Sequence, residues 1–182
     1  MPEIQNLESG ATAHRFAPAA PDGELVYGAC CPGWHSAASH DDALDDWVAF
    51  MRRHDIARVC CLLPGGESAD SGNDVDRYRR EFDAVLRAPI LDCQLADRAL
   101  LADEVLPFLD DAVAADDRVV VHCLAGIGRT GQVLAAWVAY DRGYSPERAI
   151  ETVESTGRYP REPVEAGEAT IEELENLLAT FS

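Results

Sequence analysis

The chain has 182 residues, of which 47% are hydrophobic, so it is long enough and apolar enough to bury a core. Its 33 acidic and 15 basic residues give a formal net charge of −18. This charge argues against binding to nucleic acid or to an anionic membrane, because no basic patch is present to release counterions. No signal peptide and no run of about 18 apolar residues occurs, which predicts a cytoplasmic protein.

The basic residues are all arginine, and the acidic residues are spread along the chain rather than gathered in a tail. Repulsion among so many carboxylates destabilises a compact state unless salt screens it, and halophilic proteins carry such charge. At about 1 M salt the Debye length is about 3 Å, so surface carboxylates hardly affect one another. We interpret the composition as halophilic; the alternative is a mesophilic chain from an acidic proteome.

The first half of the chain predicts short strands and helices in alternation. Residues 1–11 are small and polar and are expected to form a flexible N-terminal arm, ahead of a single domain at 12–182. Hydrophobic periodicity and turn residues then predict the following elements: strands at 14–18 and 25–30, a helix at 43–54, a strand at 56–63 and a helix at 75–86.

The second half continues this alternation. It predicts a strand at 88–91, a helix from about Leu100 to Ala112, a strand at 118–122, and helices at 132–140, from 146 and at 171–181. Ser145 is the expected cap before Pro146, and Thr170 begins a capping box. Strands that alternate with helices predict an α/β fold with a mostly parallel central sheet.

The segment from His122 to Gly131 places a cysteine and an arginine in one tight turn between a buried strand and a buried helix. Glycines in the turn permit backbone angles that other residues resist, so the amide groups can point inward. The N-terminus of a helix attracts anions through its free N–H groups and its dipole. The segment therefore predicts an anion-binding loop.

The residue types in this loop suit phosphoryl transfer. A thiolate is the nucleophilic form of cysteine, and helix N-termini favour it, so Cys123 is the candidate nucleophile. Arg129 offers a planar fork that matches two phosphoryl oxygens. The backbone N–H groups of Leu124, Ala125, Gly126, Ile127, Gly128 and Arg129 are expected to hold the remaining oxygens. His122 is expected to brace the loop by hydrogen bonding.

The order His-Cys, five residues, Arg and Thr resembles the signature of cysteine-dependent phosphatases, in particular their dual-specificity and compact archaeal tyrosine-phosphatase branch. The resemblance covers roughly residues 24–180. It implies a phosphocysteine intermediate on Cys123, phosphate binding by Arg129 and assistance from the Thr130 hydroxyl. It also implies the cysteine phosphatase fold, a mostly parallel sheet of four to five strands flanked by helices in three layers.

The family also uses an aspartate as general acid, on a loop about thirty residues before the cysteine. Asp92 follows the predicted strand 88–91, at the same sheet edge as Cys123, and is preferred. Asp97 is the alternative, although its position also suits the cap of the helix that begins near Leu100.

These features predict a hydrolase of phosphotyrosine proteins, with phosphoserine or phosphothreonine as further substrates. Ala125 and Ile127 leave the loop uncharged, whereas relatives that act on inositol lipids carry lysines there. The alternatives are a phosphatase of small metabolites or RNA 5′-phosphates, and a non-catalytic phosphoprotein-binding module. We expect a monomer without metal or cofactor whose partner is the phosphorylated protein.

Other residues are assigned less specific roles. The neighbouring cysteines 30–31 and 60–61 are expected to be buried, on opposite faces of their strands. By the resemblance, Cys61 or Cys93 is a candidate to protect the nucleophile as a reversible disulfide. Arg158, Arg161 and Glu165 lie where relatives carry a loop that positions substrate and water, with glutamine at the place of the glutamate. Trp34 and His35 are expected to pack a turn.

Overall fold

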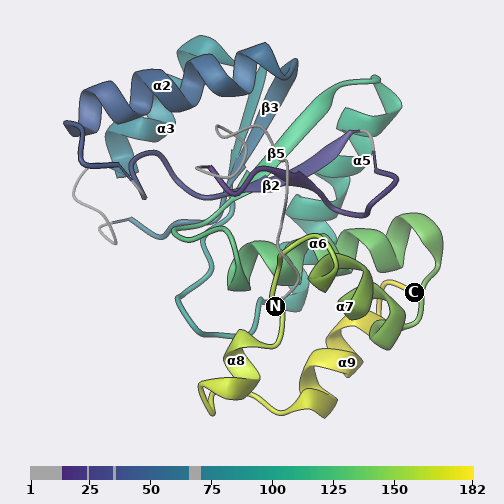
Figure 1. Cartoon of the computed structure of the whole chain (residues 1–182). Helices are drawn as coiled ribbons and strands as arrows, with labels where there is room; N and C mark the ends of the chain where they lie inside the picture. The colour runs from purple at the N-terminus through teal and green to yellow at the C-terminus, as the bar shows by residue number, and fades with distance from the viewer. Residues whose placement is uncertain (1–13, 24, 35, 66–70) are drawn as a thin grey trace.

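The computed structural model describes residues 14–23, 25–34, 36–65 and 71–182. Within these ranges, five strands form one sheet in the order β1-β2-β5-β3-β4 (Figure 1). β5 lies at the centre and pairs in parallel with β2 and β3, β4 pairs in parallel with β3, and β1 is antiparallel to β2 at one edge. The strands are β1 (Ala17–Pro18), β2 (Val26–Ala29), β3 (Ile56–Cys61), β4 (Ala84–Arg87) and β5 (Arg118–His122).

Helices cover both faces of the sheet. Helices α2 and α3 lie on one face, and the other helices lie on the opposite face, where α7 and α9 pack behind α6 (Figure 1). Their bounds are α2 (His40–Arg53), α3 (Ser71–Glu81), α4 (Arg98–Leu100), the π-helical turn η1 (Leu101–Val105), α5 (Leu106–Ala114), α6 (Gly128–Arg142), α7 (Pro146–Glu154), α8 (Glu162–Glu165) and α9 (Ile171–Ala179).

The alternation of side chains along β5 produces these layers. Val119 and Val121 belong to the apolar cluster formed with α5, α6, α7 and α9. Val120 points the other way, into the cluster formed with α2 and α3. Helix α6 is buried on nearly all sides because it lies between the sheet and two further helices. The two clusters hold β5, and therefore the loop that follows it, from both faces.

The predicted fold class is confirmed: the sheet is mostly parallel, has five strands and lies between two layers of helices. The helix at 43–54 is confirmed as α2, with Leu44, Trp47, Val48 and Met51 buried and with Ser39 as its cap. The expected caps Ser145 and Thr170 also accept hydrogen bonds from backbone N–H groups of α7 and α9. The N-terminal arm at 1–11 lies outside the described residues.

Two neighbouring predictions are wrong in their bounds. The helix expected at 75–86 spans Ser71–Glu81, and the strand expected at 88–91 is β4, at Ala84–Arg87. A short apolar run does not distinguish a strand from the end of a helix. The predicted helix and strand therefore both lie too far towards the C-terminus. Residues 88–91 still lie along the sheet edge, because the N–H groups of Ala88 and Ile90 donate to the carbonyls of Cys61 and Leu62.

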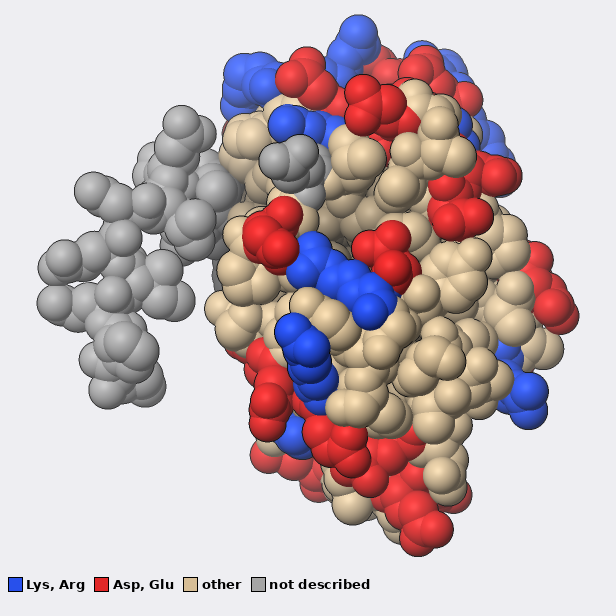
Figure 2. Space-filling model, turned by 90° about the vertical axis from the view of Figure 1, so that its right-hand side faces the viewer, with Lys and Arg blue, Asp and Glu red and all other residues tan. Residues whose placement is uncertain are grey.

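Acidic side chains are spread over the surface in Figure 2, and many gather at the lower end of this view, where Figure 1 places α8 and α9. Arginines lie among them, consistent with the several ion pairs between helices and loops. Among the described residues, no helix is long and apolar enough to cross a membrane.

Candidate active site

The loop between β5 and α6 is held tightly against β2. Gly126 has a φ of +74°, a conformation that side chains with a Cβ rarely adopt. A Cβ there would lie 2.4 Å from the carbonyl oxygen of Ala29, so no side chain fits without moving the loop. The predicted need for glycine in this turn thus has two causes, the backbone angle and the contact with the neighbouring strand.

Cys123 lies at the floor of this loop and is 2% exposed. Its Sγ accepts hydrogen bonds from the Gly126 N–H at 3.3 Å and from the Thr130 hydroxyl at 3.2 Å. Both donors contact the atom that would attack phosphorus. The Thr130 hydroxyl, to which the resemblance assigns an assisting role, thus contacts the Cys123 sulfur.

Three carbonyl groups of the loop point away from its centre. The Leu124 and Ile127 carbonyls accept from the N–H groups of Cys31, at 3.0 Å, and Tyr159, at 3.1 Å. The Gly126 carbonyl accepts from the Arg158 guanidinium. Because the C=O and N–H of one peptide plane point in opposite directions, the N–H groups of Ala125, Ile127 and Gly128 face the inside of the loop. The loop can therefore hold an anion.

Arg158 fastens the loop to the body of the protein. It is 3% exposed and also donates to the carbonyls of Arg15 at 2.6 Å and Gly28 at 2.8 Å. Burial lowers its pKa to about 10, which leaves the guanidinium charged at neutral pH. Arg158 thus contacts the back of the loop. The sequence placed it in a family loop that positions substrate, but here its guanidinium binds backbone carbonyls of the protein.

Arg129 lies at the mouth of the loop with Asp92. The guanidinium is 2% exposed, donates to the Ile90 carbonyl at 3.2 Å and lies 3.1 Å from an Asp92 carboxylate oxygen. The Asp92 side chain is 60% exposed, so it can reach a bound ligand. The residues that the sequence analysis proposed as phosphate-binding arginine and general acid are thus adjacent.

Asp97, the alternative general acid, caps a helix. Its Oδ1 accepts from the Leu100 N–H at 2.9 Å, as expected for the first residue before α4. Gln132, which the sequence analysis did not single out, holds the loop between these two aspartates. Its amide accepts from the Ala96 N–H at 2.8 Å and donates to the Gln94 carbonyl at 3.0 Å. Gln132 is a polar residue in the otherwise apolar run at 131–139 of α6, and this was the available signal.

His122 lies behind the loop. Its Nδ1–H donates to the Cys123 carbonyl at 3.1 Å, which agrees with the expected bracing role. The ring packs edge-on against Trp47 and Tyr78. Burial lowers the pKa of His122 to about 4, so the ring is neutral at pH 7. A neutral ring with one nitrogen on a backbone carbonyl supports the loop rather than transferring protons.

The sequence analysis grouped Arg158, Arg161 and Glu165, but these residues contact different parts of the protein. Arg161 pairs with Glu154 at 2.6 Å, and exposed Glu165 accepts from the Tyr159 hydroxyl at 2.7 Å. The acidic residue that does reach the loop is Glu162, whose carboxylate lies against Gly128. No local pattern marked Glu162, because its place at the loop results from packing of α8 on α6.

The other described cysteines are all free. Cys60 and Cys61 belong to different apolar clusters, as the alternation of strand side chains predicts. Burial raises the pKa of Cys30 to about 11, of Cys31 to about 12 and of Cys61 to about 11. These thiols are thus poor nucleophiles at neutral pH. The reversible disulfide with Cys61 or Cys93 stays a prediction.

One group of described side chains could hold a metal ion. Ligand atoms of Asp92, Cys93 and Glu162 lie within 4.8 Å of one another at the mouth of the site. Asp92 is already paired with Arg129, however, and a cation there would compete with that ion pair. The expectation of a metal-free site stays a prediction.

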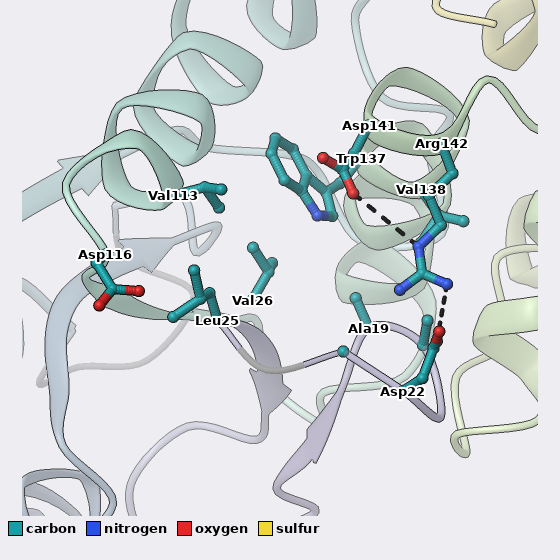
Figure 3. Close-up of a pocket in the computed structure, with 12 residues that line it drawn as sticks. Ala19, Asp22, Leu25, Val26, Val113, Asp116, Trp137, Val138, Asp141 and Arg142 are labelled. Atoms are coloured by element: carbon teal, nitrogen blue, oxygen red, sulfur yellow. Dashed lines mark hydrogen bonds and ion pairs between the residues drawn. The ribbon is translucent and has the colours of Figure 1, made fainter.

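A separate pocket of about 250 Å³ is drawn in Figure 3. It lies at the end of the sheet opposite to Cys123. Leu25 and Asp116 at its rim precede β2 and β5, whereas Cys123 follows β5. Its one arginine, Arg142, pairs with Asp22 at 2.7 Å and lies 4.0 Å from Asp141. A pocket whose arginine is already paired and whose other charged lining residues are aspartates repels a phosphate.

The strand, loop and helix around Cys123 are the features of a cysteine-dependent phosphatase. A family model described as the DSP-PTPase phosphatase of polymorphic toxin systems matches residues 37–142. The match covers more than half of the chain, which therefore belongs to this family of cysteine-based dual-specificity phosphatases. The resemblance in the sequence is thus confirmed.

A curated relative and several solved structures are similar to the chain. The dual specificity protein phosphatase Mpk3 of Drosophila melanogaster is 35% identical over 68 residues, which cover 37% of this chain and 16% of that protein. Tk-PTP in its active form is 27% identical, with a TM-score of 0.63 and coverage of 87% of this chain and 97% of that one. PTPMT1 in complex with PI(5)P has a TM-score of 0.68 at 17% identity, covering 91% and 97%, and shares the fold.

Proposed function

We propose that the protein hydrolyses phosphate monoesters of proteins, phosphotyrosine in the first place, in two steps. Cys123 attacks phosphorus, the P–O bond to the leaving group breaks, and Asp92 donates its proton to the leaving oxygen. Water then attacks the phosphocysteine, its proton returns to Asp92, and the S–P bond breaks to release phosphate and the thiolate. The observation that carries this proposal is the contact of the Cys123 sulfur with Gly126 and Thr130, next to the Arg129–Asp92 pair.

Each residue of the proposed mechanism has a distinct task. Arg129 and the inward N–H groups of the loop neutralise the charge that grows on the phosphoryl oxygens in the transition state. Thr130 donates to sulfur, so it stabilises the thiolate that leaves in the second step. Asp92 is accessible enough to receive a proton from water, which the second step requires. No cofactor enters either step.

We also propose that the protein works in the cytoplasm of a salt-rich cell. The support is the charge of −18 together with the complete absence of lysine. In molar salt the field of distant carboxylates is screened, whereas Arg129 and the loop amides act at contact distance. A phosphorylated substrate can then approach an acidic body.

The experiment that tests this proposal compares hydrolysis of phosphotyrosine peptide, phosphothreonine peptide and inositol phosphates across a series of KCl concentrations. We expect the highest kcat/KM on phosphotyrosine, and rates that rise towards molar KCl. Faster hydrolysis of inositol phosphates would contradict the proposed substrate, and a maximum at low salt would contradict the proposed halophilic character. Absence of hydrolysis of every ester, with phosphopeptide binding retained, would favour the non-catalytic binding module.

The assignment of the general acid predicts different results for two neighbouring aspartates. Replacement of Asp92 by asparagine should slow turnover of a phenyl phosphate about 10²–10⁴-fold, because the leaving oxygen departs without a proton. Asp97→Asn should leave the rate within about twofold of wild type, since asparagine caps a helix about as well as aspartate. Steady-state kinetics of both variants test the assignment, and a slow Asp97→Asn with a fast Asp92→Asn would reverse it.

A further inference from the structure

The carboxylate of Glu162 occupies the space beside the residue that precedes Arg129. A Cβ built on Gly128 would lie 1.5 Å from a Glu162 carboxylate oxygen and 2.3 Å from its carboxyl carbon. The side chain therefore fills the place that a residue larger than glycine would take. Glu162 opens helix α8, and α8 packs on α6, so this position is set by the fold around the loop.

Among the described residues, none donates a hydrogen bond to this carboxylate or forms an ion pair with it, and the charge of Arg129 is the influence that favours its ionised form. Its nearest titratable neighbours include Asp92 and Cys93, with ligand atoms within 4.8 Å. Burial raises the pKa of Glu162, the charge of Asp92 raises it further, and Arg129 opposes both. A half-buried carboxylate beside another carboxylate is unfavourable for folding. Such unfavourable arrangements are expected at functional sites, which favours a functional role for Glu162.

Negative charge on this side of the loop has a direct consequence for ligands. A phosphate held by Arg129 would lie near Glu162, because Asp92 is 3.1 Å from Arg129 and ligand atoms of Asp92 and Glu162 lie within 4.8 Å of each other. A second phosphate on the adjacent atom of the ligand would meet the Glu162 and Asp92 carboxylates, and the loop side chains Ala125 and Ile127 offer it no cation. One unit charge acting on a doubly charged phosphate about 6 Å away changes an equilibrium roughly tenfold at the dielectric constant of water and low ionic strength. Salt weakens this effect, although a half-buried carboxylate is screened less than an exposed one.

We propose that Glu162 is a specificity-determining residue that rejects ligands with a second phosphate next to the scissile one. The site would then accept isolated monoesters, such as phosphotyrosine in a peptide, and exclude vicinal bisphosphates and pyrophosphates. This inference rests on the proposed function, because it assumes that the loop holds the scissile phosphate. It adds a repulsive element to a site whose attractive elements alone do not distinguish these ligands.

Binding to an inactive enzyme tests the inference without turnover. The probes are orthophosphate and pyrophosphate, titrated calorimetrically into Cys123→Ser and into the same variant with Glu162→Gln. In a buffer of low ionic strength, removal of the charge should raise the affinity for pyrophosphate relative to orthophosphate about tenfold. The matched control is Glu151→Gln in the same background, because Glu151 is exposed on α7, away from the loop, and should leave the ratio unchanged.

The outcomes separate this inference from the proposed function. An unchanged affinity ratio in Glu162→Gln, with orthophosphate still bound, would overturn the specificity role alone. Failure of Cys123→Ser to bind orthophosphate would overturn the proposed function and this inference with it. In the active enzyme, Glu162→Gln should lower KM for 1,2-phenylene bisphosphate more than for phenyl phosphate. An equal loss of kcat on both esters would instead assign Glu162 to the chemical step and refute the inference.

Discussion

Replacement of Cys123 by serine should abolish hydrolysis of phenyl phosphate, with a loss in kcat of about 10⁴-fold or more, comparable to removal of the nucleophile in other covalent enzymes. A serine hydroxyl is not ionised near neutral pH, and the contacts that support a thiolate here, from Gly126 and Thr130, cannot supply that charge. Phosphate binding should persist, because Arg129 and the loop amides remain.

The matched control for this variant is Cys61→Ser. Cys61 is buried in a different cluster, and burial raises the pKa of its thiol to about 11, so its replacement should leave kcat near the wild-type value. Acid quenching during turnover of a labelled ester should also trap phosphate on the wild-type chain but not on Cys123→Ser. Wild-type turnover by Cys123→Ser would show that another group attacks phosphorus.

The loop around Cys123 was predictable because its determinants are local. The valines of β5, the glycines of the turn and the apolar helix are consecutive, and each predicts its own conformation. Asp92 was also within reach, since parallel strands that end at one edge bring their following loops together. The preference for Asp92 over Asp97 rested on its place after a predicted strand and stays a prediction, whereas Asp97 caps α4 as its position suggested.

The residues that support this loop were not predictable in the same way. Arg158 contacts carbonyls of residues up to 143 positions away in the sequence, and no periodicity reports such a contact. The contacts of Gln132 depend on how α6 packs against the loop at 88–97. Those of Glu162 depend on how α8 packs against α6. The bounds of β4 failed for a different reason: four half-buried residues after a helix carry too little pattern to separate strand from helix.

Arg129 is the second residue whose replacement should lower the rate of hydrolysis strongly, because of its geometry. Its guanidinium donates to the Ile90 carbonyl through one nitrogen and pairs with Asp92 through another, from a buried position. Lysine keeps the charge but has a single nitrogen on a flexible stem, so it cannot hold the Asp92 loop and two phosphoryl oxygens at once. The difference between the two side chains therefore lies in geometry rather than in charge.

We accordingly expect Arg129→Lys to lower kcat/KM for phenyl phosphate by about 10³-fold, within the range that a single transition-state arginine contributes to phosphoryl transfer. The control is Arg142→Lys, because Arg142 lies in the pocket at the other end of the sheet and pairs with Asp22. A loss of less than about tenfold in Arg129→Lys would mean that charge alone suffices. That result would contradict the bidentate contact and leave the loop amides as the main support of the transition state.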